Sequence, residues 1–345
     1  MPANKIGGVE TPPYELNMRN MSTNGYLLKV ENLKTYFAIK KGLLRRTVGY
    51  VKAVDGVSFA VGAGKTLGVV GESGCGKTTV ARSIVRLVPA TAGRVVFGQM
   101  DVLSADRRQL RQLRRQISVI FQDPFGSLNP RMTIGNIIGE PLKVQRGVRG
   151  SELVERVAVL LSKVGLSPEH INRYPHEFSG GQRQRIGVAR ALALEPKLII
   201  CDEPVSALDV SIQSQILNLL KDLQEEFGLT FLFIAHDLAV VEFFCDVVVV
   251  MYMGRIVEQA EGRELYHNPL HPYTRALMSA IPQVEPAKRG RRKAFGGEVP
   301  SALNPPPGCA FGPRCPLRQS DCLKQMPALE EKSGREGHFV ACWRC

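Results

Sequence analysis

The stretch from Gly71 to Thr79 reads GESGCGKTT and matches the phosphate-loop pattern G-x-x-x-x-G-K-[ST]. An apolar run at residues 66–70, typical of a buried strand, precedes it, and residues 79–87 have the pattern of a helix. Such a loop turns backbone N–H groups toward phosphate oxygens and sets them at the positive end of the following helix. The strand–loop–helix order therefore predicts a site for a nucleoside triphosphate.

Side chains of this loop have predicted roles. We expect the Lys77 amine to reach the β- and γ-phosphates and the Thr78 hydroxyl to hold Mg²⁺. A Gly-rich turn before an ordinary helix is the alternative interpretation, which the flanking strand and helix disfavour. The predicted nucleotide-binding residues of the loop are Gly71, Ser73, Gly74, Cys75, Gly76, Lys77, Thr78 and Thr79.

A second candidate site lies where the apolar run at residues 198–202 ends in two acids, Asp202 and Glu203. Ligands of open α/β sheets bind at the carboxyl ends of the strands, so we expect Asp202 to contact the Mg²⁺ shell. Glu203, one position further, is suited to polarise an attacking water. Two surface acids before a turn at Pro204 are the alternative, which the upstream phosphate loop disfavours.

The composition is that of a globular chain. It has 345 residues, 44% of them hydrophobic, enough for one large domain with an appendage, or for two domains. No apolar run approaches the about 20 residues that a spanning helix needs, and residues 1–25 lack the apolar core of a signal peptide. We therefore expect a cytosolic protein, or one that docks on a membrane through other subunits.

The formal net charge of +13 suggests an acidic partner, either nucleic acid or anionic lipid. One basic cluster, at residues 107–115, has leucines at helical spacing and is interpreted as the solvated face of a short helix. The other, at residues 288–293, is interpreted as a linker. Charge alone is weak evidence, so we do not expect sequence-specific binding of nucleic acid.

The pattern of elements predicts an α/β fold. Strand-like runs that suggest an antiparallel flap before the phosphate loop lie at residues 28–33, 53–59 and 66–70, with a loop or hairpin at 40–46. Buried strands then alternate with helices, at residues 117–121, 151–164, 179–194, 198–202, 210–227 and 229–235. This alternation implies a parallel sheet covered on both faces.

The segment from Ser179 to Arg185 reads SGGQRQR and resembles the signature motif of ABC-type ATPases. Four other motifs are similar to the same family, in the same order along the chain. They are an adenine-stacking aromatic residue (Phe37 or Tyr36), a Q-loop (Gln122), a D-loop (residues 206–209) and a switch histidine (His236). The ordered set covers about residues 28–260 and identifies the chain as a member of this family.

The resemblance implies a P-loop ABC cassette with a parallel-sheet core, an antiparallel β flap and a helical subdomain. In such cassettes two subunits meet head to tail, so each ATP lies between one phosphate loop and the partner's signature motif. The glycines let backbone N–H groups approach the γ-phosphate, at the positive end of a helix. The residues implied to act across this interface are Ser179, Gly180, Gly181, Gln182 and Asp209.

The resemblance also implies a catalytic set. Gln122 would sense Mg²⁺ and water and link the site to a membrane partner, and it is implied to be a Mg²⁺ ligand together with Thr78 and Asp202. His236 would hold the γ-phosphate side. A lone histidine after a buried strand is usually structural, but its place in the ordered set favours this role. Glu203 completes the set, and nothing in the sequence marks a site that has lost hydrolysis.

The C-terminal part indicates which group within the ABC-type ATPases the chain resembles. Residues 271–277 read HPYTRAL and residues 308–316 read GCAFGPRCP, and both resemble the C-terminal region of oligopeptide and dipeptide importer ATPases. In that group two different ATPase subunits lie beneath two membrane permease subunits, and a substrate-binding protein supplies the cargo. The resemblance implies ATP-driven peptide import at the cytoplasmic face of the cell membrane. The chain resembles the second ATPase of such a system more than the first.

Two alternatives stay open. Nickel and glutathione importers of the same group use a similar engine, because the ATPase never touches the cargo. From another class, a soluble ABC ATPase with a metal-bound tail could act on nucleic acid or as a regulator, which only the basic charge supports.

Five of the eight cysteines crowd into the tail, at Cys309, Cys315, Cys322, Cys342 and Cys345. Disulfides are rare in cytosolic proteins, and four thiolates suit tetrahedral zinc or a [4Fe–4S] cluster. The spacings match neither common zinc pairs nor a ferredoxin run. The resemblance assigns a [4Fe–4S] cluster to Cys309, Cys315, Cys322 and Cys342, with zinc or free thiols as alternatives.

The predicted organisation has three parts. A disordered leader spans residues 1–25, and an ABC nucleotide-binding domain spans 26–262, with a helical subdomain at about 125–190. A small Cys-rich appendage follows at 263–345, where Pro and Gly become frequent. Without a core of its own, such an appendage would gain stability from a metal centre.

Overall fold

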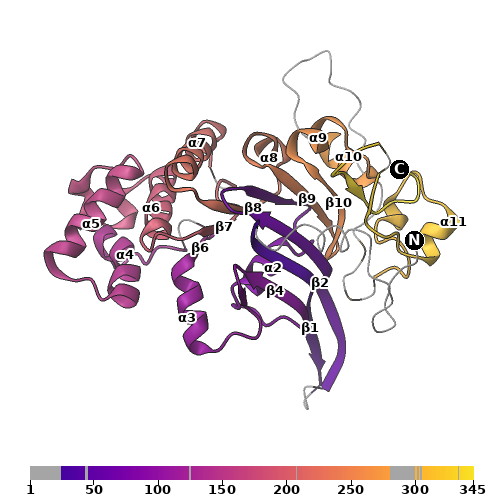
Figure 1. Ribbon diagram of the computed structural model, residues 1–345, viewed down its shortest axis with the longest axis horizontal. Helices are drawn as coiled ribbons and strands as arrows, with labels where there is room; N and C mark the ends of the chain where they lie inside the picture. Colours follow the sequence, from indigo (N-terminus) through magenta and orange to yellow (C-terminus); the bar gives the residue numbers. More distant parts are fainter. Residues whose placement is uncertain are drawn as a thin grey trace.

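The computed structural model describes residues 25–42, 46–123, 126–206, 208–279, 300, 303, 305–332 and 334–345. The predicted leader, apart from Gly25, lies outside these residues, as do the basic linker at 288–293 and Ala207 of the D-loop. In the described residues, two sheets form the centre of the molecule, with a helical group at one end and the C-terminal part at the other (Figure 1).

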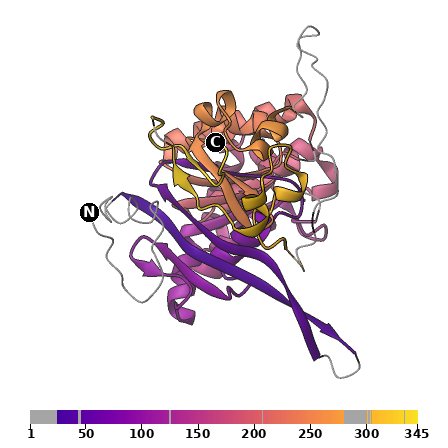
Figure 2. The ribbon, with the colours of Figure 1, turned by 90° about the vertical axis from the view of Figure 1, so that its right-hand side faces the viewer.

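A four-stranded antiparallel sheet forms the predicted flap, but the run at residues 66–70, which was predicted to belong to it, pairs in parallel with two strands of the large sheet. Its order is β2–β1–β4–β5, with bounds β1 (Tyr26–Lys41), β2 (Arg46–Gly62), β4 (Ala92–Phe97) and β5 (Met100–Asp101). β1 and β2 form one long hairpin, whose outer end projects away from the rest of the molecule in Figure 2. Of the excursion expected at residues 40–46, Lys40 and Lys41 belong to β1 and Arg46 begins β2, and residues 43–45 lie outside the described residues.

The large sheet has eight strands in the order β11–β12–β10–β9–β3–β8–β7–β6. The five strands from β9 to β6 pair in parallel, and every residue of β3, β7 and β8 is buried, as the continuous apolar runs predict. Their bounds are β3 (Thr66–Val70), β6 (Ile117–Ile120), β7 (Leu198–Asp202), β8 (Thr230–Ala235) and β9 (Val247–Tyr252).

The other edge of this sheet is antiparallel. β10 (Arg255–Glu261) pairs antiparallel with β9 and with β12 (Phe339–Val340), which pairs with β11 (Glu330–Glu331). The predicted parallel core is therefore confirmed, but the sheet as a whole is mixed. Its last two strands come from the C-terminal part, which we had expected to form a separate appendage.

The helix after the phosphate loop, α2 (Lys77–Ile84), differs from the prediction for residues 79–87. It begins two residues earlier, because Lys77 and Thr78 already belong to its first turn. It ends earlier because Arg86, two residues after its end, has a left-handed backbone with φ 54°. The start at Lys77 places both predicted phosphate-binding side chains at the positive end of the helix.

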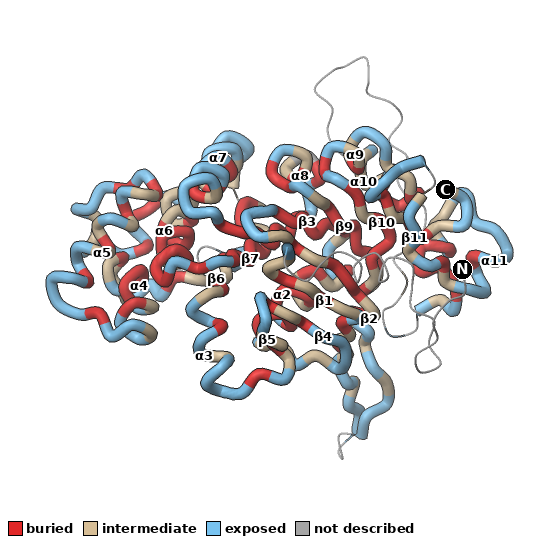
Figure 3. The backbone as a smooth tube through the Cα atoms, in the orientation of Figure 1, coloured by how far each residue is buried: buried red, intermediate tan, exposed pale blue. Residues whose placement is uncertain are grey.

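The helical group contains α4 (Ile134–Pro141), α5 (Gly150–Lys163) and α6 (Gly180–Leu192), of which α5 and α6 lie close to the bounds predicted for them. α7 (Val210–Phe227) has the predicted bounds, and α8 (Leu238–Phe244) follows β8. On α3 (Arg107–Gln116) only Leu113 is buried, so the interpretation as a solvated helix is confirmed (Figure 3). Among the described helices, none is long and apolar enough to cross a bilayer.

The C-terminal part adds α9 (Gly262–His267), α10 (Pro272–Ser279) and α11 (Ser320–Lys324). Leu265, Tyr273 and Phe311 belong to the same buried cluster as the strands of the large sheet. The boundary predicted near residue 262 falls between β10 and α9, yet the apolar core continues across it. The division into domains at this point stays a prediction.

Candidate nucleotide-binding and hydrolysis site

The phosphate loop is tightly packed between β3 and α2. Gly71 has φ +153° and Gly76 has φ +110°. A Cβ atom on either glycine would lie 2.2 Å from a backbone oxygen, that of Met251 or of Ala53. Only glycine fits both positions, because other residues rarely adopt such φ values and main chain fills the space. The packing of the loop against its own chain thus fixes its path.

Lys77 lies buried under this loop. Its Nζ donates hydrogen bonds to the carbonyl oxygens of Gly71, at 2.7 Å, and Glu72, at 3.1 Å. It also lies 3.9 Å from a carboxylate oxygen of Glu203. An ammonium group with three donors can exchange such carbonyl partners for phosphate oxygens. The amine is therefore in reach of the position where the loop would hold phosphates.

Thr78 and Asp202 come together at the carboxyl edge of the sheet. The Thr78 hydroxyl donates to a carboxylate oxygen of Asp202 at 2.9 Å. Burial raises the pKa of Asp202, and the hydrogen bond from Thr78 works against this rise. A hydroxyl beside a carboxylate is an oxygen donor set of the kind Mg²⁺ prefers. The two side chains thus fit the predicted Mg²⁺ ligands.

Glu203 is the centre of the predicted catalytic set. One carboxylate oxygen accepts a hydrogen bond from the Gln122 amide at 2.9 Å and lies 3.3 Å from Nδ1 of His236. The three residues follow β6, β7 and β8, neighbouring parallel strands whose carboxyl ends share one edge. The backbone of Glu203 is left-handed, with φ 49°, and strain of this kind clusters at functional sites.

The signature motif lies apart from this group. Ser179 caps α6: its hydroxyl accepts from the backbone of Gln182, whose side chain accepts in turn from the backbone of Ser179. Ser179 and Asp209 are exposed, and the Asp209 side chain does not cap α7. In the part of the chain that the structure describes, no hydrogen bond or ion pair joins the motif to the phosphate loop. Within the motif, Ser179 is exposed and the residues from Gly180 to Arg183 are half-buried, whereas Gln184 is buried.

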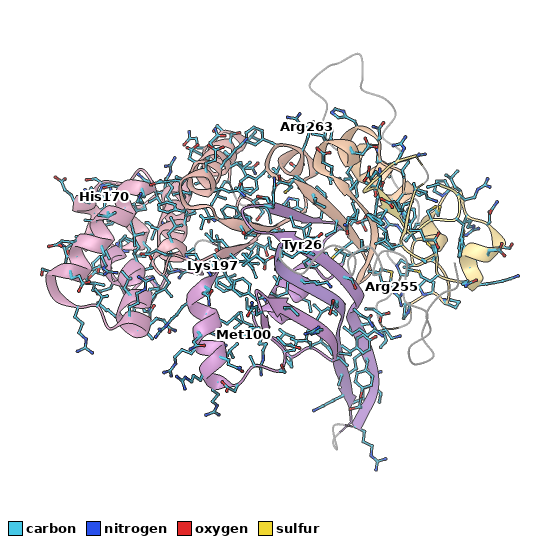
Figure 4. The ribbon with its side chains drawn as sticks, in the orientation of Figure 1. Tyr26, Met100, His170, Lys197, Arg255 and Arg263 are labelled. Carbon is cyan, nitrogen blue, oxygen red and sulfur yellow. The ribbon has the colours of Figure 1, made fainter. Side chains whose placement is uncertain are left out.

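The two candidate aromatic residues have different surroundings. The Tyr36 hydroxyl donates to Asp55, which also pairs with Arg255 of β10, labelled in Figure 4. Burial, with the bond to Asp55, raises the pKa of Tyr36 to about 12. The Phe37 side chain is 43% exposed. The free face of its ring favours Phe37 over Tyr36 as the residue that stacks on a base.

The four cysteines assigned to a cluster line one small cavity, beside Phe311. The backbone N–H of Cys309 donates to the carbonyl of Cys322 at 2.7 Å. A hydrogen bond from Cys345 lowers the pKa of Cys342 to about 6. Among the described residues, no group of three or more His, Cys, Asp or Glu side chains could hold a metal ion. The zinc site is thus not supported, and neither is a bound cluster.

Two contacts of the phosphate loop were missed by the sequence analysis. The Tyr273 hydroxyl accepts from the backbone N–H of Glu72 at 2.8 Å, and the Arg314 guanidinium pairs with the Glu72 carboxylate at 2.9 and 3.2 Å. The partners lie 201 and 242 residues apart in the chain. The sequence HPYTRAL marked the Tyr273 segment but carried no signal for this contact.

Comparisons with known proteins agree with the motifs. Residues 54–206 match the family model "ABC transporter", and residues 257–322 match "Oligopeptide/dipeptide transporter, C-terminal region". The oligopeptide transport ATP-binding protein AppF of Bacillus subtilis (strain 168) is 53% identical over 321 residues, covering 92% of this chain and 96% of that protein. The oligopeptide transport ATP-binding protein OppF of Escherichia coli (strain K12) is 55% identical, covering 92% and 95%.

Solved structures agree on the fold. A dimeric ATP-binding cassette in a post-hydrolysis state, bound to ADP and Pi, is 30% identical with a TM-score of 0.61, covering 68% of this chain and 99% of that chain. CbiO1 of Clostridium perfringens, part of an ABC transporter complex, is 28% identical with a TM-score of 0.60, covering 71% and 92%. The chain belongs to the family of ABC-type ATPase subunits of oligopeptide and dipeptide importers.

Proposed function

We propose that this ATPase forms a head-to-tail dimer with a second, similar ATPase subunit and drives import of di- and oligopeptides through two membrane permease subunits. The observation that carries the hydrolytic part is the Glu203 carboxylate, held by Gln122 and His236 and 3.9 Å from Lys77. The names of the two curated relatives support peptides as the cargo. The similarity to a dimeric cassette supports the dimer.

In this proposal the phosphate loop binds the triphosphate of ATP. Lys77 exchanges its bonds to loop carbonyls for bonds to the β- and γ-phosphates. The backbone N–H groups of the loop and the N-terminus of α2 supply further positive potential. Thr78 and Asp202 hold Mg²⁺, and Gln122 reaches its shell. When bound, the ion neutralises charge on the transferred phosphoryl group.

Glu203 polarises the water that attacks the γ-phosphate. Its carboxylate accepts a hydrogen bond from this water and draws its proton, so that negative charge develops on the water oxygen that attacks the γ-phosphate. His236 then holds the γ-phosphate side, and the Gln122 amide keeps the carboxylate oriented. The left-handed backbone of Glu203 supports this role, because the strain persists only where the surroundings enforce it.

The signature motif acts on the ATP of the opposite subunit. Gly180 and Gly181 open α6, so their N–H groups belong to the set that a helix leaves without partners at its N-terminus. A γ-phosphate of the partner's ATP can accept from these groups, and Asp209 lies near the same face. Phe37 stacks on the adenine of the ATP bound by its own phosphate loop.

Attachment to a membrane is proposed to be peripheral, at the cytoplasmic face of the cell membrane. The permease subunits supply the spanning helices, and a substrate-binding protein delivers the cargo to them. Nickel or glutathione as cargo has no support in the names of the two curated relatives. Action on nucleic acid rests on the net charge of +13 alone.

Peptide uptake by cells that lack the matching ATPase tests this function. The wild-type chain should restore uptake of a labelled peptide and hydrolyse ATP, whereas Lys77→Ala should lose at least about 90% of both activities. Lys221→Ala, an exposed lysine on α7, is the matched control and should keep both. ATPase activity without uptake of any peptide, stimulated by nucleic acid in a salt-dependent manner, would favour the alternative.

We also propose a [4Fe–4S] cluster on Cys309, Cys315, Cys322 and Cys342. Its support is that the four side chains line one small cavity, and cysteine thiolates are the usual ligands of such clusters. Anaerobically purified chain should contain about four irons, lost in Cys315→Ser and kept in Cys345→Ser. Zinc in place of iron, or neither metal, would overturn the cluster.

A further inference from the structure

Glu72 is the only acidic residue of the phosphate-loop stretch GESGCGKTT, and the C-terminal part holds it from two sides. Tyr273 of α10 accepts from its backbone N–H at 2.8 Å. Arg314 pairs with both of its carboxylate oxygens, at 2.9 and 3.2 Å. The main chain and the side chain of one loop residue are thus both fixed by residues far along the sequence.

Arg314 is itself held rigidly. Its side chain is only 7% exposed, and it also donates to the Tyr252 hydroxyl at 3.3 Å. The guanidinium lies about 6 Å from the ring centroids of Tyr252 and Phe311. These two rings and that of Tyr273 pack together with centroids 4.7 to 5.5 Å apart. A bidentate pair with one buried partner, Arg314, and a Glu72 side chain that is 27% exposed differs from a fully exposed ion pair, which contributes little.

Glu72 carries a negative charge within the loop that is proposed to bind the triphosphate. Triphosphate is strongly anionic, and a carboxylate in the loop that binds it would repel it. Pairing with Arg314 cancels this charge and turns the carboxylate toward the C-terminal part. The hydrogen bond to Glu72 also raises the pKa of Arg314, so the guanidinium stays charged. Without Arg314, the Glu72 charge would be uncompensated beside the bound phosphates.

We propose that Arg314 is a positioning residue for ATP binding: it neutralises and anchors Glu72 so that the phosphate loop can accept the triphosphate. This inference rests on the proposed nucleotide site. It gives the C-terminal part a function at that site, through a residue that contacts neither the reacting atoms nor the catalytic set.

The test measures the Kd for ATP with Mg²⁺ on the purified full-length chain. Arg314→Gln should raise this Kd about tenfold, the size expected for one uncompensated charge near phosphate. Glu72→Gln should bind at least as tightly as the wild type, although it breaks the same pair. The double variant Arg314→Gln with Glu72→Gln should return to within about twofold of the wild type. Arg318→Gln, an exposed arginine on the same segment, is the matched control.

Steady-state kinetics and thermal unfolding distinguish a positioning role of Arg314 from a purely structural role. In Arg314→Gln the KM for ATP should rise while kcat at saturating ATP stays within about threefold. Loss of structure alone would lower the unfolding temperature in both Arg314→Gln and the double variant, with no rescue of the Kd by Glu72→Gln. That result, or unchanged binding by Arg314→Gln, would overturn the inference.

Two further variants cover the remaining outcomes. If Arg314→Gln does not fold, Glu72→Gln alone still tests the proposal. Weaker ATP binding by Glu72→Gln than by the wild type would contradict the charge argument. Arg314→Lys keeps the charge and should bind within about threefold of the wild type. Failure of the wild type to bind ATP, or wild-type binding by Lys77→Ala, would instead overturn the proposed nucleotide site.

Discussion

The two halves of the proposed ATP site are built in opposite ways. In the phosphate half, Lys77, Asp202 and Glu203 are mostly buried and contact one another or the loop within a single chain. In the signature half, Ser179 and Asp209 are exposed at the starts of two helices. The first half is complete in one chain, whereas the second presents donors for which the described part of the same chain offers no partner.

Two glycines, Gly71 and Gly180, make the same distinction, although a Cβ on the neighbouring Gly181 would lie 2.6 Å from the Ile212 side chain. Gly71 must be glycine for the packing of its own chain, because a Cβ would lie 2.2 Å from a carbonyl oxygen. A Cβ on Gly180 would only touch Leu208 at 3.4 Å, an ordinary contact, and its φ is not in the left-handed region. The fold does not require glycine there. In the proposed dimer the phosphate of a partner's ATP would approach this position, where the absence of a side chain leaves room for it.

The largest expected effect comes from Glu203→Gln, which keeps the shape of the phosphate half but removes its charge. Hydrolysis should fall about a thousandfold, since a neutral amide cannot accept a proton from the attacking water. ATP binding should persist, so the two halves should stay closed on ATP and the dimer with the partner subunit should accumulate. Phosphate release and light scattering measure the two effects.

Glu195→Gln is the control for this variant, because Glu195 is exposed and pairs only with Arg146 among the described residues. It should hydrolyse ATP at the wild-type rate. Residual hydrolysis by Glu203→Gln within about tenfold of the wild type would show that another group activates the water.

Gly180→Ala should impair the signature half and leave the phosphate half unchanged. Because the added methyl group meets only an ordinary contact, the unfolding temperature and the Kd of the isolated chain for ATP should stay unchanged. Hydrolysis by the assembled dimer should fall about thirtyfold, since the methyl group blocks the approach of the partner's phosphate. Equilibrium binding to the single chain and turnover with the partner subunit are the two measurements.

Gly187→Ala is a matched control on the same helix. No atom lies within 4 Å of its added Cβ, so it should keep full activity, and the higher helix propensity of alanine should favour folding slightly. If Gly180→Ala hydrolyses ATP as fast as Gly187→Ala, the signature half does not approach phosphate closely.

The phosphate half could be predicted from sequence because its parts follow topological rules. Gln122, Glu203 and His236 lie far apart in the chain, but each follows a parallel strand, and the carboxyl ends of such strands share one edge. The antiparallel edge of the sheet could not be predicted in this way. β11 and β12 have two residues each, too short for any periodic pattern to show.

Side-chain contacts between segments that are distant in the chain could not be predicted from the sequence either. Nothing in the residue types of Glu72 and Arg314 pairs them, since the chain holds 45 basic and 32 acidic residues. The sequence analysis left the choice between Tyr36 and Phe37 open for a local reason. The pairing of β1 with β2 shifts register between Thr35 and Tyr36, so simple alternation does not tell which ring faces the nucleotide.

The smallest expected effect decides between these two rings and concerns the rim of the phosphate half. Phe37→Ala should raise the Kd for ATP about tenfold, because stacking on a base contributes about 1–3 kcal/mol. It should leave the Kd for inorganic triphosphate unchanged, since triphosphate has no base. Tyr36→Phe should leave both Kd values unchanged and lower the stability by about 1 kcal/mol, through loss of the hydrogen bond to Asp55.

The opposite pattern would identify Tyr36 as the residue that stacks on the adenine base. In that case Phe37→Ala would bind ATP like the wild type, and Tyr36→Ala would lose affinity for ATP but not for triphosphate. Either pattern sharpens the contrast between the halves, because adenine affinity then depends on β1 of one chain alone, whereas turnover also depends on Gly180 of the other. Equal losses for ATP and triphosphate in Phe37→Ala would mean that this ring supports the phosphate loop and does not stack on the base.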